Sequence, residues 1–337
     1  MALKVTQVNI QHWNNNKYIF QCDLHNFNPD IIFINETGKV NNNSIKLTGY
    51  RSISKSNENH SGVAIFIRNT IPFTQIITSD PNILAIRIMT TLGPLILITA
   101  YIPPRIPTLP IINFNKLFNY NLPIILAADL NAHHPFLHNT KNYNKDGDIK
   151  GKQLYHFANN RNLTFLGPFF HTFKAGNRKG TPDVVLANKL ANLFHIKIDS
   201  GNHIGSDHIP INITISTLPI KIIINSKTNV KTLKIDQYKE ELSKITFPEL
   251  NNKPIQAIDS NIQTLFDQIL TATANNCNKT KIITIKSYKP SPKTKLKLKQ
   301  FQSAISHNQV YGCPSQHILN VIRNELINLI TVEKELI

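Results

Sequence analysis

The sequence predicts an α/β fold in which two β-sheets pack face to face and helices lie outside them. Two observations support this fold class. Up to about Thr217, short apolar runs typical of strands alternate with turn-rich segments, and few helical segments lie between them. Hydrophobic residues make up 41% of the 337-residue chain, which is enough to bury a sizeable core.

Each strand is predicted where an apolar run is bounded by turn-forming residues. The predicted strands are Lys4–Ile10, Asp30–Asn35, Gly62–Arg68, Ile83–Met89, Pro94–Tyr101, Leu122–Ala128, Leu163–Leu166, Asp183–Ala187 and Ile209–Ile215. The predicted helices are Lys17–Asn26, Ile112–Phe118 and Gly151–Asn160. Polar loops are predicted at Asn41–Ser44, Ser54–Ser61 and His138–Asp148.

The composition changes after residue 217, where residues 218–232 are rich in Ile and Lys and contain no acidic residue. Further on, two sets of apolar residues recur at helical spacing: Ile255, Ile258, Ile262, Leu265, Phe266 and Ile269, and then Leu319, Ile322, Leu326 and Ile330. Two prolines exclude a regular helix through Ser287–Lys293. We therefore predict one domain at residues 1–217 and a basic helical extension at residues 218–337.

The charge balance predicts a polyanionic partner. Lys and Arg number 37 against 20 Asp and Glu, which gives a formal net charge of +17. Nucleic acid is the simplest partner of this kind, although a codon bias toward Lys, Asn and Ile would also raise the charge. The three cysteines show neither metal-type spacing nor a disulfide framework, which favours a reducing intracellular setting. We expect neither secretion nor membrane insertion, because the N-terminus lacks a signal-peptide pattern and no apolar run approaches the ~20 residues that span a bilayer.

Polar residues suited to phosphodiester hydrolysis stand at the ends of the predicted strands. They are Asn9, Glu36, Tyr101, Asp129, Asn131, Asp183, Asp207 and His208. If these strand ends share one edge of the sandwich, the side chains converge in one cleft. Carboxylate and amide oxygens suit Mg²⁺, and a histidine whose tautomer is held by a carboxylate can accept a proton from water.

Each of these residues alone has an ordinary structural explanation. Ser206-Asp207-His208 would be a solvated turn, Asp129-Leu130-Asn131 a turn or helix cap, and Tyr101 a core aromatic. Their joint occurrence, each at its own strand end, favours catalysis.

In this order the residues resemble the endonuclease/exonuclease/phosphatase superfamily over roughly residues 3–217. The local sequences of Thr99–Pro104, Ala128–His134 and Thr181–Ala187 are most similar to the apurinic-like endonuclease of jockey-like non-LTR retrotransposons. The resemblance implies a four-layered sandwich of two mixed β-sheets flanked by helices. Two departures are Ala128 and Ser61, where the family usually or often has glycine.

The resemblance implies a metal site. Glu36 would be the main Mg²⁺ ligand, helped by Asn9 and Asp207, and Mn²⁺ is an alternative cofactor.

The same resemblance implies roles for the other site residues. His208 would act on the attacking water or contact the scissile phosphate, and Asp183 would orient its imidazole. Asp129 would position or deprotonate the nucleophile beside Asn131, and Tyr101 would hydrogen-bond the phosphate. Which group is the general base stays open.

The segment Lys174–Gly180 resembles a hairpin that presses into a DNA groove, with Lys174, Arg178 and Lys179 as DNA-binding residues. An ordinary basic surface turn is the alternative. The implied product is a nick in double-stranded DNA with a 3′-hydroxyl that primes reverse transcription, and the implied place of action is the nucleus.

The extension at 218–337 resembles the connector that precedes the polymerase in jockey-like proteins and could contact element RNA. The chain lacks the Tyr/Phe-Ala-Asp-Asp polymerase motif, so we expect a protein truncated before the polymerase. Three other functions stay open: a decayed nucleic-acid-binding remnant, an abasic-site repair endonuclease and a phosphoinositide phosphatase. The oligomeric state is not predicted.

Overall fold

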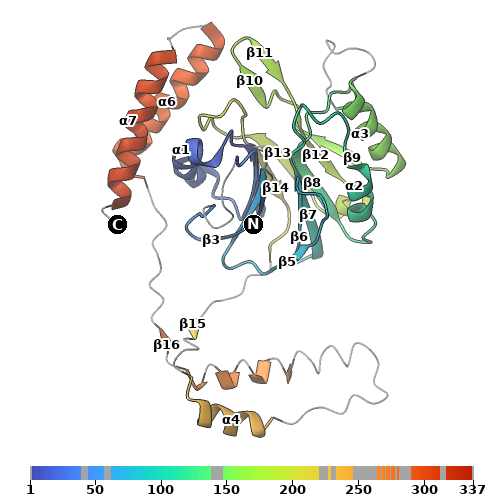
Figure 1. Ribbon diagram of the computed structural model, residues 1–337, viewed down its shortest axis with the longest axis vertical. Helices are drawn as coiled ribbons and strands as arrows, with labels where there is room; N and C mark the ends of the chain where they lie inside the picture. Colours follow the sequence, from blue (N-terminus) through green and yellow to red (C-terminus); the bar gives the residue numbers. More distant parts are fainter. Residues whose placement is uncertain are drawn as a thin grey trace. The chain divides into compact units, whose positions relative to one another are not determined.

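A computed structural model describes residues 2–38, 45–56, 62–137, 147–219, 227–228, 233–245, 264–265, 267–269, 271–273, 275–277, 279–280, 290–311 and 316–335. The chain divides into two compact units, Met1–Ile222 with Ser287–Ile337, and Ile223–Lys286. The first unit contains two six-stranded sheets (Figure 1).

The first sheet has the strand order β13-β14-β1-β2-β4-β3. Its strands are β1 (Leu3–Asn9), β2 (Ile31–Asn35), β3 (Tyr50–Ser56), β4 (Gly62–Arg68), β13 (Ile196–Ser200) and β14 (Ile211–Ile215). The second sheet has the order β5-β6-β7-β8-β12-β9. Its strands are β5 (Phe73–Ile76), β6 (Ile83–Thr90), β7 (Gly93–Ala100), β8 (Ile124–Asp129), β9 (Thr164–Gly167) and β12 (Asp183–Ala187). A separate hairpin pairs β10 (Phe173–Ala175) with β11 (Arg178–Gly180).

Three buried clusters separate four layers. One lies between the sheets and includes Phe33 and Ile65 of the first sheet and Leu97 of the second. The second packs α2 (Ile111–Phe118) and α3 (Ile149–Asn160) on the outer face of the second sheet. The third packs α1 (Trp13–Phe27) on the outer face of the first sheet. The predicted layered sandwich of two mixed sheets is confirmed.

Two further helices, α6 (Pro292–Tyr311) and α7 (Gln316–Glu335), belong to the first unit. Their buried residues Phe301 and Leu326 lie in the same cluster as Trp13 of α1. The second unit contains α4 (Ile235–Ser243), β15 (Lys227–Thr228) and β16 (Lys279–Thr280). A domain boundary at residue 217 stays a prediction.

The topology explains why the strand ends meet. Each sheet has a parallel pair at its centre, β1 with β2 and β7 with β8. On one side of each pair lies an antiparallel strand, β14 beside β1 and β12 beside β8. An antiparallel neighbour begins where the parallel strand ends, as Asp183 opposite Asp129 illustrates. Residues that follow β1, β2, β7 and β8 therefore lie beside residues that precede β12 and β14.

All the predicted strands are present with bounds within two residues, and α1 begins four residues before its predicted start. The predicted loop at Ser54–Ser61 is wrong for Ser54–Ser56, which pair with β4 in β3. Because β3 is an edge strand, its polar residues lack the apolar pattern that signals a buried strand. The prediction that Ser287–Lys293 contains no regular helix is wrong for Pro292 and Lys293, because α6 begins at Pro292. Proline is tolerated in the first turn of a helix.

Parts of several predictions lie outside the described residues. They are the loop residues 41–44, 57–61 and 138–146, residues 287–289, and Ile255, Ile258, Ile262 and Phe266. Among the described residues, no helix is long and apolar enough to cross a lipid bilayer.

The packing of α7 can be tested with Leu326, which is fully buried. We expect Leu326→Ala to lower the free energy of unfolding by about 2–5 kcal/mol, because it removes buried apolar contacts and leaves a cavity. Val321 of the same helix is 42% exposed, so Val321→Ala should change stability by less than about 0.5 kcal/mol. Urea unfolding measures both. Equal midpoints for the two variants would show that α7 does not stabilise the unit.

Candidate active site

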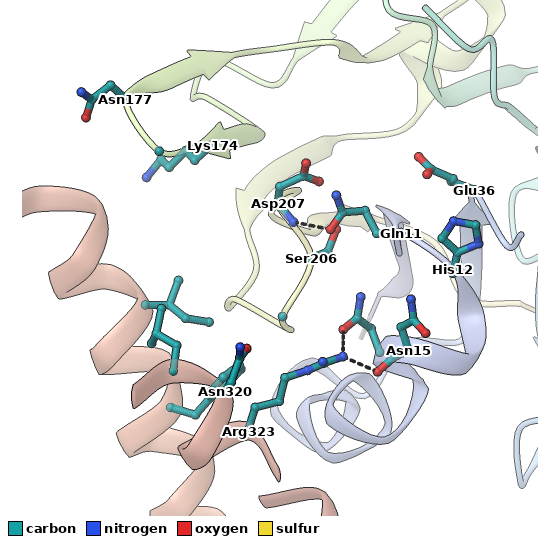
Figure 2. Close-up of a pocket in the computed structure, with 16 residues that line it drawn as sticks. Gln11, His12, Asn15, Glu36, Lys174, Asn177, Ser206, Asp207, Asn320 and Arg323 are labelled. Carbon is teal, nitrogen blue, oxygen red and sulfur yellow. Dashed lines mark hydrogen bonds between the residues drawn. The ribbon is translucent and has the colours of Figure 1, made fainter. Parts of the chain in front are cut away.

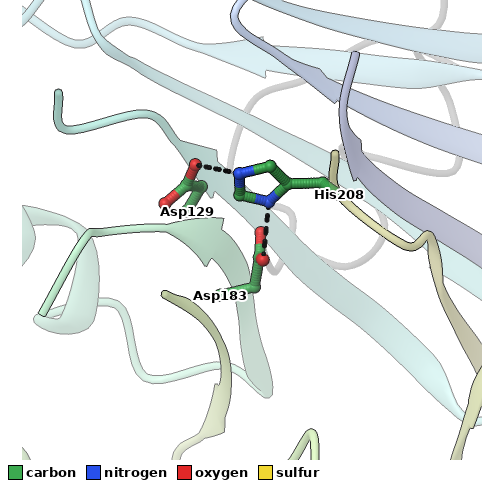
Figure 3. Close-up of side chains that lie close together, drawn as sticks. All are labelled: Asp129, Asp183 and His208. Atoms are coloured by element: carbon green, nitrogen blue, oxygen red, sulfur yellow. Dashed lines mark hydrogen bonds and ion pairs between the residues drawn. The ribbon is translucent and has the colours of Figure 1, made fainter. Parts of the chain in front are cut away.

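A buried imidazole lies between two carboxylates (Figure 3). His208 Nδ1 is 3.0 Å from Asp183 Oδ2, and His208 Nε2 is 3.9 Å from Asp129 Oδ2. Asp129 ends β8, Asp183 begins β12, and His208 precedes β14. The three residues bring possible ligand atoms within 4.8 Å of one another, so they form a group that could hold a metal ion.

Asp183 is held by one donor from the first sheet and one from the segment that precedes the β10–β11 hairpin. Gln7 Nε2 donates to Asp183 Oδ1 at 2.9 Å, and Thr172 Oγ1 donates to Oδ2 at 2.5 Å. Gln7 also donates to Asn35 Oδ1 at 2.7 Å. Gln7, Asn35 and Thr172 were not identified from the sequence. Gln7 and Asn35 carried one signal, a polar residue inside an apolar strand, and Gln7 follows Leu3 and Val5 on the inward face of β1. Thr172 lies outside the strands and carried no such signal.

Asn9 joins the two sheets at their carboxylates. Its Nδ2 donates to Glu36 Oε2 and to Asp129 Oδ2, both at 2.9 Å. On the other side of Asp129, the backbone N and the side-chain Nδ2 of Asn131 donate to Oδ1 at 3.2 and 2.9 Å. Both oxygens of the Asp129 carboxylate are therefore oriented by amide donors.

Tyr101 donates its hydroxyl to Glu36 Oε2 at 2.9 Å. Burial raises the pKa of the Tyr101 hydroxyl, and the neighbouring carboxylates of Glu36 and Asp129 raise it further. The hydroxyl therefore stays protonated and serves as a hydrogen-bond donor.

The charges in the cluster depend on one another. Burial lowers the pKa of His208, but the carboxylates of Asp183, Asp129 and Asp207 outweigh it and raise the pKa above the ordinary value. Burial raises the pKa of Asp129, and so does Asp183, while His208 and the hydrogen bond from Asn9 act in the opposite direction. The cluster therefore favours a shared proton near His208.

Asp207 differs from the other carboxylates in having an unsatisfied oxygen. Its Oδ1 is buried and has no hydrogen-bond partner among the described residues, and it lies 3.9 Å from His208 Nε2. Burial raises the pKa of Asp207, and the charge of His208 partly offsets this effect. A buried carboxylate oxygen without a donor is suited to a cation.

Backbone strain is concentrated around these residues. Gln11, His12, Glu36 and Asn131 have φ of 47°, 72°, 54° and 46°. A positive φ is costly for residues other than glycine and persists where surrounding contacts impose it. Here His12 N donates to Glu36 O at 2.9 Å, and Asp207 N donates to the Gln11 side chain at 3.1 Å. Gln11 and His12 were not identified from the sequence, because no residue type marks the strain.

The β10–β11 hairpin borders the same site. Lys174 N donates to Asp207 O at 2.8 Å, and the Phe173 ring lies edge-on to the His208 ring at 5.4 Å. Lys174 and Lys179 are directly opposite each other across the hairpin, which is unfavourable for like charges. The predicted basic segment is therefore a hairpin attached to the segment that carries Asp207 and His208.

A cavity of about 900 Å³ lies over the cluster. It is lined by seven of the eight predicted polar residues, namely Asn9, Glu36, Tyr101, Asp129, Asn131, Asp207 and His208. The eighth, Asp183, is hydrogen-bonded to His208. Arg178 and Lys179 of the hairpin also line the cavity. The structure thus brings the eight predicted polar residues to one site with Arg178 and Lys179, whereas Lys174 does not line this cavity. Their individual roles stay predictions.

His133 also lines this cavity and was not predicted as a site residue. Asp148, the N-cap of α3, interacts with His133 Nδ1 at 2.9 Å and accepts from its backbone N at 3.2 Å. A Cβ added at Gly151 would lie 2.0 Å from His133 O. Glycine at 151 therefore allows α3 to approach the His133 backbone closely.

Sequence comparisons find proteins that are similar to this chain over part of its length. A family model described as endonuclease-reverse transcriptase matches residues 95–212. The RNA-directed DNA polymerase from mobile element jockey of Drosophila funebris is 24% identical over 250 residues, covering 71% of this chain and 26% of the relative. The probable RNA-directed DNA polymerase from transposon X-element of Drosophila melanogaster is 25% identical over 223 residues, covering 63% and 24%. The chain spans about a quarter of the length of these relatives.

Solved structures show the same architecture. The endonuclease domain of TRAS1, a telomere-specific non-LTR retrotransposon, has a TM-score of 0.54 at 18% identity and covers 64% of this chain and 98% of that domain. The chain has the endonuclease/exonuclease/phosphatase fold. An AP endonuclease of Leishmania major has a TM-score of 0.51 at 13% identity and covers 64% of this chain and 87% of that protein. The resemblance predicted from the sequence is confirmed.

In this endonuclease/exonuclease/phosphatase fold, Thr172 provides a test of how Asp183 is held. We expect Thr172→Val to lower the free energy of unfolding by about 1–3 kcal/mol, because it removes a hydrogen bond to a buried carboxylate without changing the side-chain shape. Thr181, another buried threonine beside the hairpin, donates only to Phe170 O at 3.3 Å. Thr181→Val should therefore destabilise less in chemical denaturation. If the two variants lose equal stability, the hydrogen bond from Thr172 to Asp183 contributes no more to the free energy of unfolding than the bond from Thr181 to Phe170 O.

Proposed function

We propose that this chain is a divalent-metal-dependent endonuclease that hydrolyses phosphodiester bonds of double-stranded DNA and leaves a nick with a 3′-hydroxyl. The buried His208, held between Asp183 and Asp129 at the base of a cavity bordered by a cationic hairpin, carries this proposal. The match to an endonuclease-reverse transcriptase model over residues 95–212 supports the same reaction class.

Glu36 and Asp207 are the residues we propose to hold the metal, with Asn9 aligning Glu36. The buried group of Asp129, Asp183 and His208 is less suited to it. Both oxygens of Asp183 and of Asp129 already accept hydrogen bonds, and His208 Nδ1 is directed at Asp183. Asp207 Oδ1, in contrast, has no donor among the described residues. Oxygen ligands of this kind favour Mg²⁺, or Mn²⁺ in its place, and the bound ion would polarise the phosphoryl oxygen.

The protein side chains would orient water and phosphate. Asn9 and Asn131 fix the Asp129 carboxylate, so that it can accept a proton from an attacking water. Asp183 holds His208 Nδ1 and leaves Nε2 for the phosphate. The Tyr101 hydroxyl is a second donor that can turn from Glu36 to a phosphate oxygen.

Duplex DNA is the proposed substrate because of the hairpin and the overall charge. Arg178 and Lys179 are exposed at the cavity, and the chain has a formal net charge of +17. A polyanion relieves the repulsion between the opposed Lys174 and Lys179. By analogy with the polymerases named above, we propose that the nick supplies a primer for reverse transcription at nuclear DNA, and that residues 218–337 form a connector able to contact element RNA.

The catalytic assignment is tested by nicking of supercoiled plasmid. We expect Mg²⁺-dependent nicking that EDTA abolishes, and a loss of about 10²–10⁴-fold in His208→Ala and Asp129→Asn, the range of a removed acid–base group. Asp199→Asn, an exposed carboxylate on β13 paired with Lys197, should retain activity. Absence of metal-dependent nicking by well-folded protein would refute the proposal. Preference for plasmid with abasic sites would indicate a repair enzyme instead.

The hairpin contact is tested by the salt dependence of DNA binding. We expect Lys179→Ala to reduce the slope of log affinity against log salt by about 0.9, the effect of one lost phosphate contact. Lys116→Ala, an exposed lysine on α2, is the matched control and should leave the slope unchanged. Fluorescence anisotropy with a duplex in EDTA measures both. The same slope in the two variants would exclude Lys179 from the interface.

A further inference from the structure

A second cavity, of about 910 Å³, adjoins the catalytic one. The two share four lining residues, Gln11, Glu36, Asn177 and Asp207. A molecule that occupies the catalytic cavity can therefore continue past Glu36 and Asp207 into the second. We refer to the second cavity as the side groove (Figure 2).

The far wall of the side groove is formed by α6 and α7. Phe301 and Ile305 of α6 and Leu319, Asn320 and Arg323 of α7 line it. The TRAS1 endonuclease domain is 98% covered by 64% of this chain, so the remainder of this chain has almost no counterpart there. The two helices thus add a wall that the two-sheet sandwich does not itself provide.

The wall is firmly attached to the catalytic unit. Arg323 Nη2 donates to Asn15 O at 2.7 Å and to Asn16 Oδ1 at 3.0 Å (Figure 2). Asn16 in turn donates to Ile10 O at 2.8 Å, directly after β1. Gln302 of α6 donates to Asp23 Oδ1 of α1 at 3.2 Å. The position of α7 is therefore coupled to the backbone that carries Asn9 and Gln11.

The lining of the side groove suits a nucleic-acid strand. Amide side chains such as Asn15, Asn177 and Asn320 both donate and accept hydrogen bonds, and Lys174 adds a cation. Away from the border at Glu36 and Asp207, the lining residues include no carboxylate. The exposed lysines 293, 295 and 299 of α6 add positive charge to the same helix.

We propose that the side groove binds the DNA strand that flanks the scissile phosphate, so that α6 and α7 form part of the substrate-binding surface. The inference rests on the proposed endonuclease function, because that function places DNA in the adjoining cavity. Amides, cations and apolar side chains contact backbone and bases without selecting a sequence. The groove then increases the number of nucleotides that contact the protein and orients the strand relative to His208.

Asn320→Glu tests the proposal, since Asn320 is exposed on α7 and glutamate is compatible with a helix. Asn328→Glu makes the same charge change at an exposed position of α7 that does not line the groove. We expect Asn320→Glu to weaken binding of a long duplex by about two- to fivefold, the effect of one unfavourable surface charge, with no change in Asn328→Glu. A short duplex that fills only the catalytic cavity should bind both variants equally.

Anisotropy in EDTA measures binding, so the result does not depend on turnover. Hydroxyl-radical footprinting should show fewer protected nucleotides on one side of the cleavage position in Asn320→Glu. If wild-type protein nicks plasmid but both variants bind the long duplex equally, the groove proposal fails while the endonuclease function stands. If only binding of single-stranded RNA is weakened by Asn320→Glu, the assignment to DNA is overturned. If the wild type does not nick but Asn320→Glu weakens duplex binding, the groove is a DNA-binding surface, the endonuclease function fails, and the assignment of the groove to the strand beside a scissile phosphate fails with it.

Discussion

The buried pair of Asp183 and His208 is the interaction on which the rest of the site depends. A charged carboxylate at 2% exposure is unfavourable unless it is well supplied with donors. Asp183 receives them from Gln7, Thr172 and His208, which lie on or beside three separate strands. Because Gln7 of β1 and Thr172 beside the hairpin both donate to Asp183 of β12, the pair links the first sheet, the second sheet and the hairpin. The same hydrogen bonds that stabilise the sandwich therefore also set the orientation of the His208 ring.

Asn9 holds the carboxylates of Glu36 and Asp129 close together. Two carboxylates repel each other, and a single amide donating to both offsets the repulsion without introducing a charge. The positive φ at Glu36 and Asn131 places a strained residue just after β2 and β8, next to the two carboxylates. Among the described residues, Asp207 Oδ1 accepts no hydrogen bond, so this oxygen is available to a cation beside the uncharged Asn9 bridge.

The fold was predictable because the information it needs is local. Nine apolar runs identified nine of the twelve strands in the two sheets, and their polar ends mark residues that the structure brings together. The edge strands β3, β5 and β13 were not predicted. The bonds inside the site were not predictable, because a glutamine such as Gln7 looks the same in the sequence whether it faces Asp183 or solvent. The strained Gln11 carried no signal at all, since strain depends on contacts far away in the chain. The helical spacing at Leu319, Leu326 and Ile330 predicted α7 correctly, but no periodicity reveals which surface an apolar face will cover.

The packing of α7 adds a helix from the C-terminal region to the unit that contains the two sheets. An amphipathic helix joined by a long connection can usually pack on several surfaces of a domain. Burial of its apolar face discriminates weakly between these surfaces, because the hydrophobic effect is non-directional. Here direction comes from polar contacts, since Arg323 reaches the start of α1 and Asn16 links it to the end of β1. Any shift of α7 would break bonds beside Gln11, which holds the Asp207 backbone. The C-terminal helices are thus placed to influence the position of Asp207, even though they contribute none of the eight polar residues that meet at the strand ends.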